Sequence, residues 1–109
     1  MPTPQINSIE LTSGSEVVLT TDPNSPAYNE FTLYGSNLGN TTSVDLESGS
    51  DYSWVVTGIS ATSNSVTVGA YAFGDAQGSG TVYAVVHTTE SYATSPTMEV
   101  DFVALPLID

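Results

Sequence analysis

The chain has 109 residues, 12 acidic side chains, no lysine or arginine, and a formal net charge of −12. This length suits one domain, spanning residues 1–109, with a single core. The missing basic side chains exclude nucleic acid and anionic membranes as partners, because both are bound through neutralised phosphates, and the missing cysteines exclude disulfides and thiolate metal sites.

The N-terminal residues Met1–Gln5 lack the basic start and apolar block of a signal peptide. No apolar run approaches the roughly 18 to 20 residues that a membrane span needs. We therefore expect synthesis in the cytoplasm without export by that route, although a fragment of a larger secreted protein would have the same features.

Apolar and polar residues alternate along almost the whole chain, which is the pattern of half-buried strands. In chain order, the alternating positions are Ile9 and Leu11, Val17 and Leu19, Phe31 and Leu33, Val44 and Leu46, Trp54 and Val56, Val66 and Val68, Val82, Ala84 and Val86, and Met98, Val100 and Phe102. Clusters of Gly, Ser, Asn, Asp and Pro separate these segments, and no window has a helical repeat. The pattern predicts an all-β, antiparallel β-sandwich of seven to nine strands.

Two features of this layout carry more detailed predictions. Residues 21–29 form the longest predicted loop, in which Pro23 and Pro26 should interrupt the sheet. The inward positions should be Phe31, Leu33, Val44, Trp54, Val66, Val82, Val86, Val100 and Phe102.

The stretch NEFTLYGSNLGNTTSVDL, residues 29–46, resembles the start of an IPT/TIG domain, the immunoglobulin-like module of surface receptors, some transcription factors and bacterial surface proteins. The matching positions are Phe31, Leu33, Gly35, Asn37, Leu38, Gly39, Val44 and Leu46. Residues 4–11 and 64–89 are similar to the family's first strand and second half. The chain departs from the family in its early two-proline loop and in lacking a proline after Val68. The resemblance implies an immunoglobulin-like sandwich.

In the same stretch, Gly35 and Gly39 should reverse the chain, since glycine adopts positive φ without steric cost. Leu38 should fill the end of the sandwich between its two sheets. This interpretation makes the motif structural.

Residues able to catalyse a reaction are scarce. His87 is the only histidine and should face outward beside Tyr83, so it cannot build a zinc site or a Ser/His/Asp triad alone. Asp45 and Glu47 should share a solvated strand face; a paired-carboxylate glycosidase would use such residues, but nothing else supports one. We predict no catalytic residues, no cofactor and no enzymatic activity.

Calcium and carbohydrate are the ligands that the sequence leaves open. The loop residues Asp22, Asn24, Asp51 and Asp75 could supply oxygen ligands, but they form no recognised calcium motif, so we predict no metal site. Residues 73–80 read as a hairpin tip and not as a phosphate cradle. Trp54 is expected in the core, and the six tyrosines suggest a protein contact surface more than a glycan platform.

After Phe102 the chain continues into an apolar tail, Leu105, Pro106, Leu107 and Ile108, which is the candidate partner-docking segment. We predict a non-enzymatic structural or interaction protein. The main hypothesis is a bacteriophage capsid decoration (cement) protein on the virion surface, binding the major capsid protein or another virion protein as a homo-oligomer, with a trimer as the first guess. The alternative is an adhesive or spacer module of a bacterial surface protein or carbohydrate-active enzyme, located extracellularly or at the cell surface.

Overall fold

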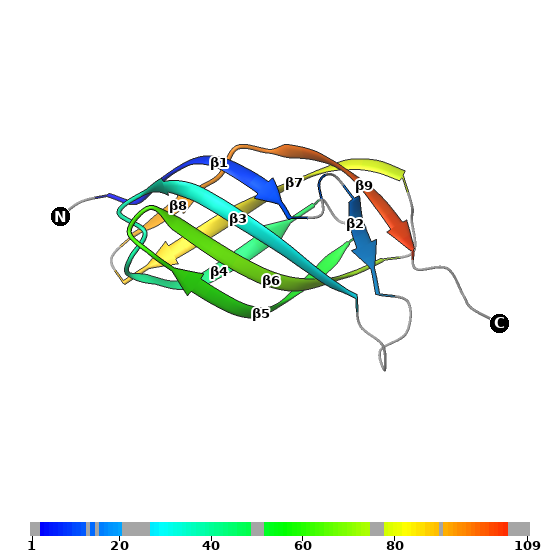
Figure 1. Cartoon of the computed structure of the whole chain (residues 1–109), viewed down its shortest axis with the longest axis horizontal. Coiled ribbons are helices and arrows are strands. Elements are labelled where there is room, and N and C mark those ends of the chain that lie inside the picture. The colour runs from blue at the N-terminus through cyan, green and yellow to red at the C-terminus, as the bar shows by residue number, and fades with distance from the viewer. Residues whose placement is uncertain are drawn as a thin grey trace.

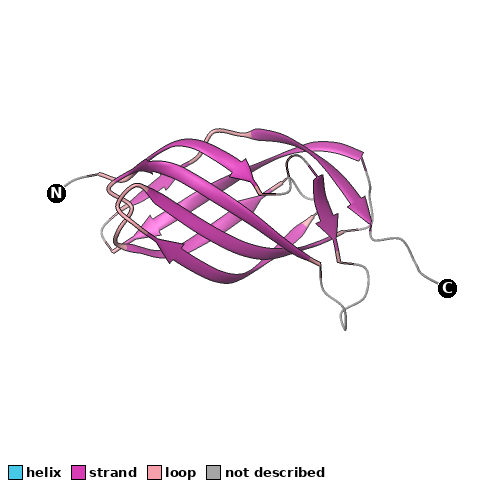
Figure 2. Ribbon diagram, viewed as in Figure 1, coloured by secondary structure: helices cyan, strands magenta, loops and turns pink. Residues whose placement is uncertain are grey.

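β-Strands make up the regular structure of the chain. The computed structural model describes residues 3–12, 14, 16–20, 27–48, 52–74, 78–89 and 91–104. These residues form nine strands and no helix: β1 (Gln5–Leu11), β2 (Glu16–Leu19), β3 (Tyr28–Ser36), β4 (Thr41–Glu47), β5 (Ser53–Ala61), β6 (Ser65–Phe73), β7 (Gly78–Thr88), β8 (Tyr92–Thr94) and β9 (Met98–Ala104) (Figures 1 and 2). The predicted all-β class and strand number are confirmed. No helix in these ranges is long and apolar enough to cross a membrane.

The strands form two layers (Figure 1). One layer contains β1, β3, β6 and β5, each antiparallel to the next. The other contains β9, β7 and β4, with the short β8 continuing the edge of β7 beyond β9. The core lies between the layers, where each strand presents every second side chain.

Burial follows the predicted alternation closely. Of the nine positions expected to point inward, all but Trp54 are buried. Trp54 is partly buried and packs its ring edge-on against Phe31, with centroids 5.6 Å apart. Its indole N–H donates to Ser48 Oγ at 3.1 Å, which satisfies the polar end of the side chain. The prediction that Trp54 belongs to the core is therefore confirmed in the main.

The strand β2 departs from the antiparallel prediction. It runs parallel to β9 and forms a single parallel bridge to β6, from Leu19 to Ala72. The reason is that β2 continues in the direction of β1 after a kink at Gly14, where φ is 103° and the N–H bonds to the Leu11 carbonyl. The chain thus passes from one layer to the other without reversing, and the sheet is mixed.

A buried side chain, Asn29, fixes β2 in place. Its Oδ1 accepts from the Val18 N–H at 2.9 Å, and its Nδ2 donates to the Val18 carbonyl at 3.0 Å. The amide thereby imitates a backbone pairing from β3 to β2. The sequence-based assignment of residues 28 and 29 to a loop was wrong, because both belong to β3; residues 21–26, with both prolines, lie outside the described ranges.

The turn between β3 and β4 is built differently from the prediction. Positive φ falls on Asn37, at 58°, and not on Gly35 or Gly39. Gly35 lies within β3, where a Cβ would overlap the backbone oxygen of Gln5 on β1. Glycine is needed at this position because the two strands approach each other closely. Leu38 is fully buried and fills the end of the sandwich, as predicted.

The strand β8 was missed by the sequence analysis, because three residues are too few to show alternation. Between β8 and β9, the backbone N–H and C=O of Ala84 on β7 are hydrogen-bonded by a single residue, Ser95. Its N–H donates to the Ala84 carbonyl and its Oγ accepts from the Ala84 N–H, both at 2.8 Å. One serine therefore closes the ladder across the interruption at residues 95–97.

Candidate functional site

Several predicted site residues fall outside the described ranges. These are the tail residues Leu105, Pro106, Leu107 and Ile108 and the candidate calcium ligands Asp22, Asn24, Asp51 and Asp75. Tail docking therefore stays a prediction. Within the described residues, no three or more His, Asp or Glu side chains lie close enough together to hold a metal ion.

His87 and Asp45 form a pair on the outer face of the β4–β7 layer. The distance from His87 Nε2 to Asp45 Oδ2 is 3.0 Å, and both side chains are well exposed to solvent. His87 faces outward as predicted, with the Tyr92 ring 6.3 Å away between centroids. A solvated pair of this kind stabilises a fold little.

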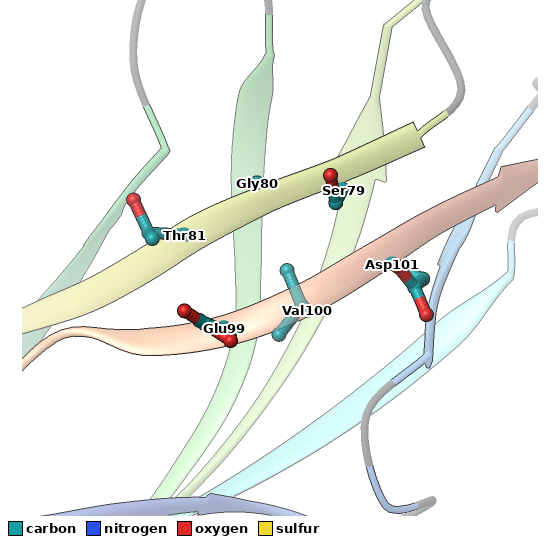
Figure 3. Close-up of a pocket in the computed structure, with 6 residues that line it drawn as sticks. All are labelled: Ser79, Gly80, Thr81, Glu99, Val100 and Asp101. Carbon is teal, nitrogen blue, oxygen red and sulfur yellow. The ribbon is translucent and has the colours of Figure 1, made fainter.

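The same outer face carries an open hollow between β7 and β9 (Figure 3). Small residues line it on β7, namely Ser79, Gly80 and Thr81, and two carboxylates, Glu99 and Asp101, line it on β9. Gly80 is required because a Cβ there would press on the Phe102 ring beneath. The hollow is open and acidic, so it would attract positive charge.

The outer face of the other layer carries a row with two tyrosines. Tyr28 on β3, Tyr71 on β6 and Val55 on β5 stand in one row across three paired strands. The two tyrosine rings pack edge-to-face with centroids 6.3 Å apart, and Tyr28 is 56% exposed. The ring of Tyr28 lies over Gly69, where a Cβ would overlap it. This row confirms the expectation that tyrosines face outward.

Tyr28 is also tied to a carboxylate. Its hydroxyl donates to Glu30 Oε2 at 3.4 Å, while Thr12 Oγ1 donates to Glu30 Oε1 at 3.2 Å. Partial desolvation of the ring and then the negative charge of Glu30 raise the pKa of Tyr28 above its ordinary value of 10.0. Not every tyrosine is outward, since Tyr52 stacks on the buried Phe102 with centroids 3.8 Å apart.

The edge strand β5 is a feature that the sequence analysis missed. Among the described strands β5 pairs only with β6, which leaves its other edge without a partner strand. Its sequence, SWVVTGISA, has no charged residue, and Val55 and Ile59 are 50% and 38% exposed. This uncharged, apolar segment in an otherwise acidic chain is the sequence feature that could have indicated an exposed contact edge. The described surface thus offers the acidic hollow, the row of Tyr28, Tyr71 and Val55, and the edge of β5 as contact areas.

Comparison with known proteins does not assign the chain to a family. No family model matches the chain, and no curated protein matches it. Among solved structures, the chain is similar to the crystal structure of domains 4 and 5 of the S-layer protein SbsC, with 19% sequence identity and a TM-score of 0.46. The similarity covers 95% of this chain and 54% of that one, so the chain spans about half the length of the structure it matches. The IPT/TIG resemblance remains a prediction from its own residues.

Proposed function

We propose that this chain is a non-enzymatic structural module of a surface protein, serving as a spacer or adhesive unit within a string of domains. The observation that supports it most is the path of the chain. β1 starts near one end of the sandwich and β9 finishes at the opposite end (Figure 1). A module entered and left at opposite ends adds its full length to a string, whereas one with adjacent ends forms a side branch.

The surface chemistry supports the same proposal. The outward faces carry threonines, serines and carboxylates, and the chain has a net charge of −12 with no basic side chain. A uniform negative charge keeps neighbouring modules soluble and apart. The outward-facing row of Tyr28, Tyr71 and Val55 gives such a module one local area suited to contact.

The capsid decoration hypothesis is the competing proposal. It relies on the tail from Leu105 to Ile108 reaching a major capsid protein, and that tail lies outside the described residues. The acidic body fits a basic patch on a shell as well as it fits a string of repelling modules. The two proposals differ in where the protein is found.

The experiment is to locate the protein in its source. Antibodies raised against the purified domain are applied to intact cells and to purified virions, and labelling is imaged by electron microscopy. Labelling of the cell surface that disappears after protease treatment of intact cells is the expected result. Labelling of virion shells would replace this proposal with capsid decoration, and label only in the soluble cell interior would overturn both.

A further inference from the structure

The outer edge of β5 has the properties of a strand-pairing surface. β5 is nine residues long, and β4, which lies beside it, pairs with β7 alone among the described strands. Trp54 and Val56, near the start of β5, pack against the core, but the following stretch from Thr57 to Ser60 is exposed throughout. An exposed strand edge presents backbone N–H and C=O groups to any strand that can approach it.

An apolar side chain at this edge is only partly covered. Ile59 stands in the row that begins with Phe31 on β3 and passes through Val68 on β6. Phe31 and Val68 are fully buried between the layers, whereas Ile59 is 38% exposed at the end of the same row. The side chain therefore points to the inner side of the sheet but is less covered there than Phe31 and Val68.

Charge decides which partner suits this edge. The other long edge strands carry carboxylates, Glu10 on β1 and Asp45 and Glu47 on β4, while β5 carries none. Like charges placed opposite each other destabilise a strand pair, so in a chain without basic residues a second copy can approach closely only at a neutral edge. A strongly basic partner would gain nothing specific from β5, since its attraction is to the acidic faces. We propose that two copies of this chain associate through their β5 edges, as an antiparallel strand pair about a two-fold axis.

The sequence of β5 fixes the register of this pair. Placing Ile59 opposite its own copy brings Gly58 opposite Ser60, which keeps inner side chains with inner ones and outer with outer. Small residues at Gly58, Ser60 and Ala61 allow the backbones to meet, and the two Ile59 side chains cover each other. The bulge between Val56 and Gly58 limits the pair to the segment from Thr57 to Ala61. The proposal goes beyond the proposed function and does not depend on it.

The dimer should respond to salt in a characteristic direction. Two bodies of charge −12 repel at long range, while the contact itself is uncharged. Raising NaCl from about 0.01 M to about 1 M shortens the screening length from about 30 Å to about 3 Å. Association through β5 should therefore strengthen with salt, whereas attachment of a basic partner to an acidic face would weaken.

The first test is sedimentation equilibrium of the full chain over that salt range, with two charge variants. I59E places two carboxylates opposite each other and should weaken the dimer by about tenfold or more. V55E adds the same charge to a somewhat more exposed residue of β5 outside the paired segment, and should leave the dissociation constant within about threefold of the unmodified chain. A chain that stays monomeric at high salt, or a V55E variant that dissociates as readily as I59E, overturns the proposal.

The second test uses the absence of cysteine in the chain. I59C should form an interchain disulfide on mild oxidation, because facing residues of antiparallel strands have Cα atoms about 4.5 to 5.5 Å apart, within disulfide range. S60C is the matched control: it neighbours Ile59 and is also exposed, but in this register it faces Gly58. Faster cross-linking of I59C supports the proposal, and equal rates for the two variants overturn it. Thermal melts confirm that each variant is folded.

Discussion

The strands β3 and β5 both pair with β6 along most of its length, one on each side, yet they are buried to very different degrees. β3 buries Asn29, Phe31 and Leu33, whereas no residue of β5 is fully buried. β3 has a second paired neighbour in β1, while among the described strands β5 pairs with β6 alone. Burial is therefore set by the position of a strand in the sheet more than by its own apolar content.

The largest predicted effect compares two ends of one cross-strand row. Phe31→Ala should lower the free energy of unfolding by about 3–5 kcal/mol, because the removed ring leaves a cavity among fully buried neighbours. Ile59→Ala, across Val68 in the same row, should cost less than about 1 kcal/mol, since its side chain is partly in water already. Urea unfolding of both variants measures the difference, with protein kept dilute to avoid association.

A similar cost for the two substitutions would contradict this comparison. It would mean that β5 is covered in solution, by a second copy or by rearrangement of the edge. A dilution series separates these outcomes, because the stability of a dimer depends on protein concentration.

The next effect concerns hydrogen bonds made by each strand. Asn29→Ala should cost about 2–3 kcal/mol, because both the N–H and the C=O of Val18 lose their partners. On β5, Thr57→Val removes only the hydroxyl that donates to the Gly69 carbonyl at 3.1 Å, and should cost less than about 1 kcal/mol. Hydrogen exchange at the Val18 amide should accelerate in the first variant alone; protection that survives there would show that Asn29 does not hold β2.

The third comparison is between a glycine on β3 and a glycine on β5. Gly35→Ala should cost about 1–3 kcal/mol, because the new Cβ meets the backbone oxygen of Gln5, and moving it disrupts the β1–β3 ladder. Gly58→Ala on β5 has no atom within 4 Å of the added Cβ and should be neutral or stabilise by up to about 1 kcal/mol. Thermal melts of the two variants give the sign. Because φ of Gly58 is not positive and the space around it is open, a destabilised Gly58→Ala would contradict this comparison.

The sequence predicted the fold better than the surface. Alternation located the strands around Phe31, Val68 and Val86 because burial between two layers imposes a period of two on each of them. It could not place β2 in a parallel pairing, because that depends on a kink at Gly14, nor locate β8, which is too short. The exposed edge of β5 was invisible for another reason: Trp54 and Val56 alternate like core residues, and only the order of strands shows that one side is open.

The smallest predicted effect is electrostatic and involves the row from Tyr28 on β3 to Val55 on β5. The pKa of Tyr28 is raised above 10.0 by desolvation and then by Glu30, so the folded state favours the protonated phenol. Its contribution to stability is therefore complete below pH of about 10 and is lost as pH rises through the higher folded-state value. Glu30→Gln removes the negative charge and should lower the pKa of Tyr28, whereas Val55→Ser, two strands away, should leave it unchanged.

Absorbance titration of the tyrosinate band measures this shift, and Tyr28→Phe identifies which part of the curve belongs to that residue. The phenol is more than half exposed, so solvent screens the interaction and the shift should shrink further in high salt. A Tyr28 signal that does not move in Glu30→Gln would mean that desolvation against Gly69 and Tyr71 accounts for the whole effect. In that case packing of the ring against the sheet, and not the carboxylate of Glu30, sets the pKa of Tyr28.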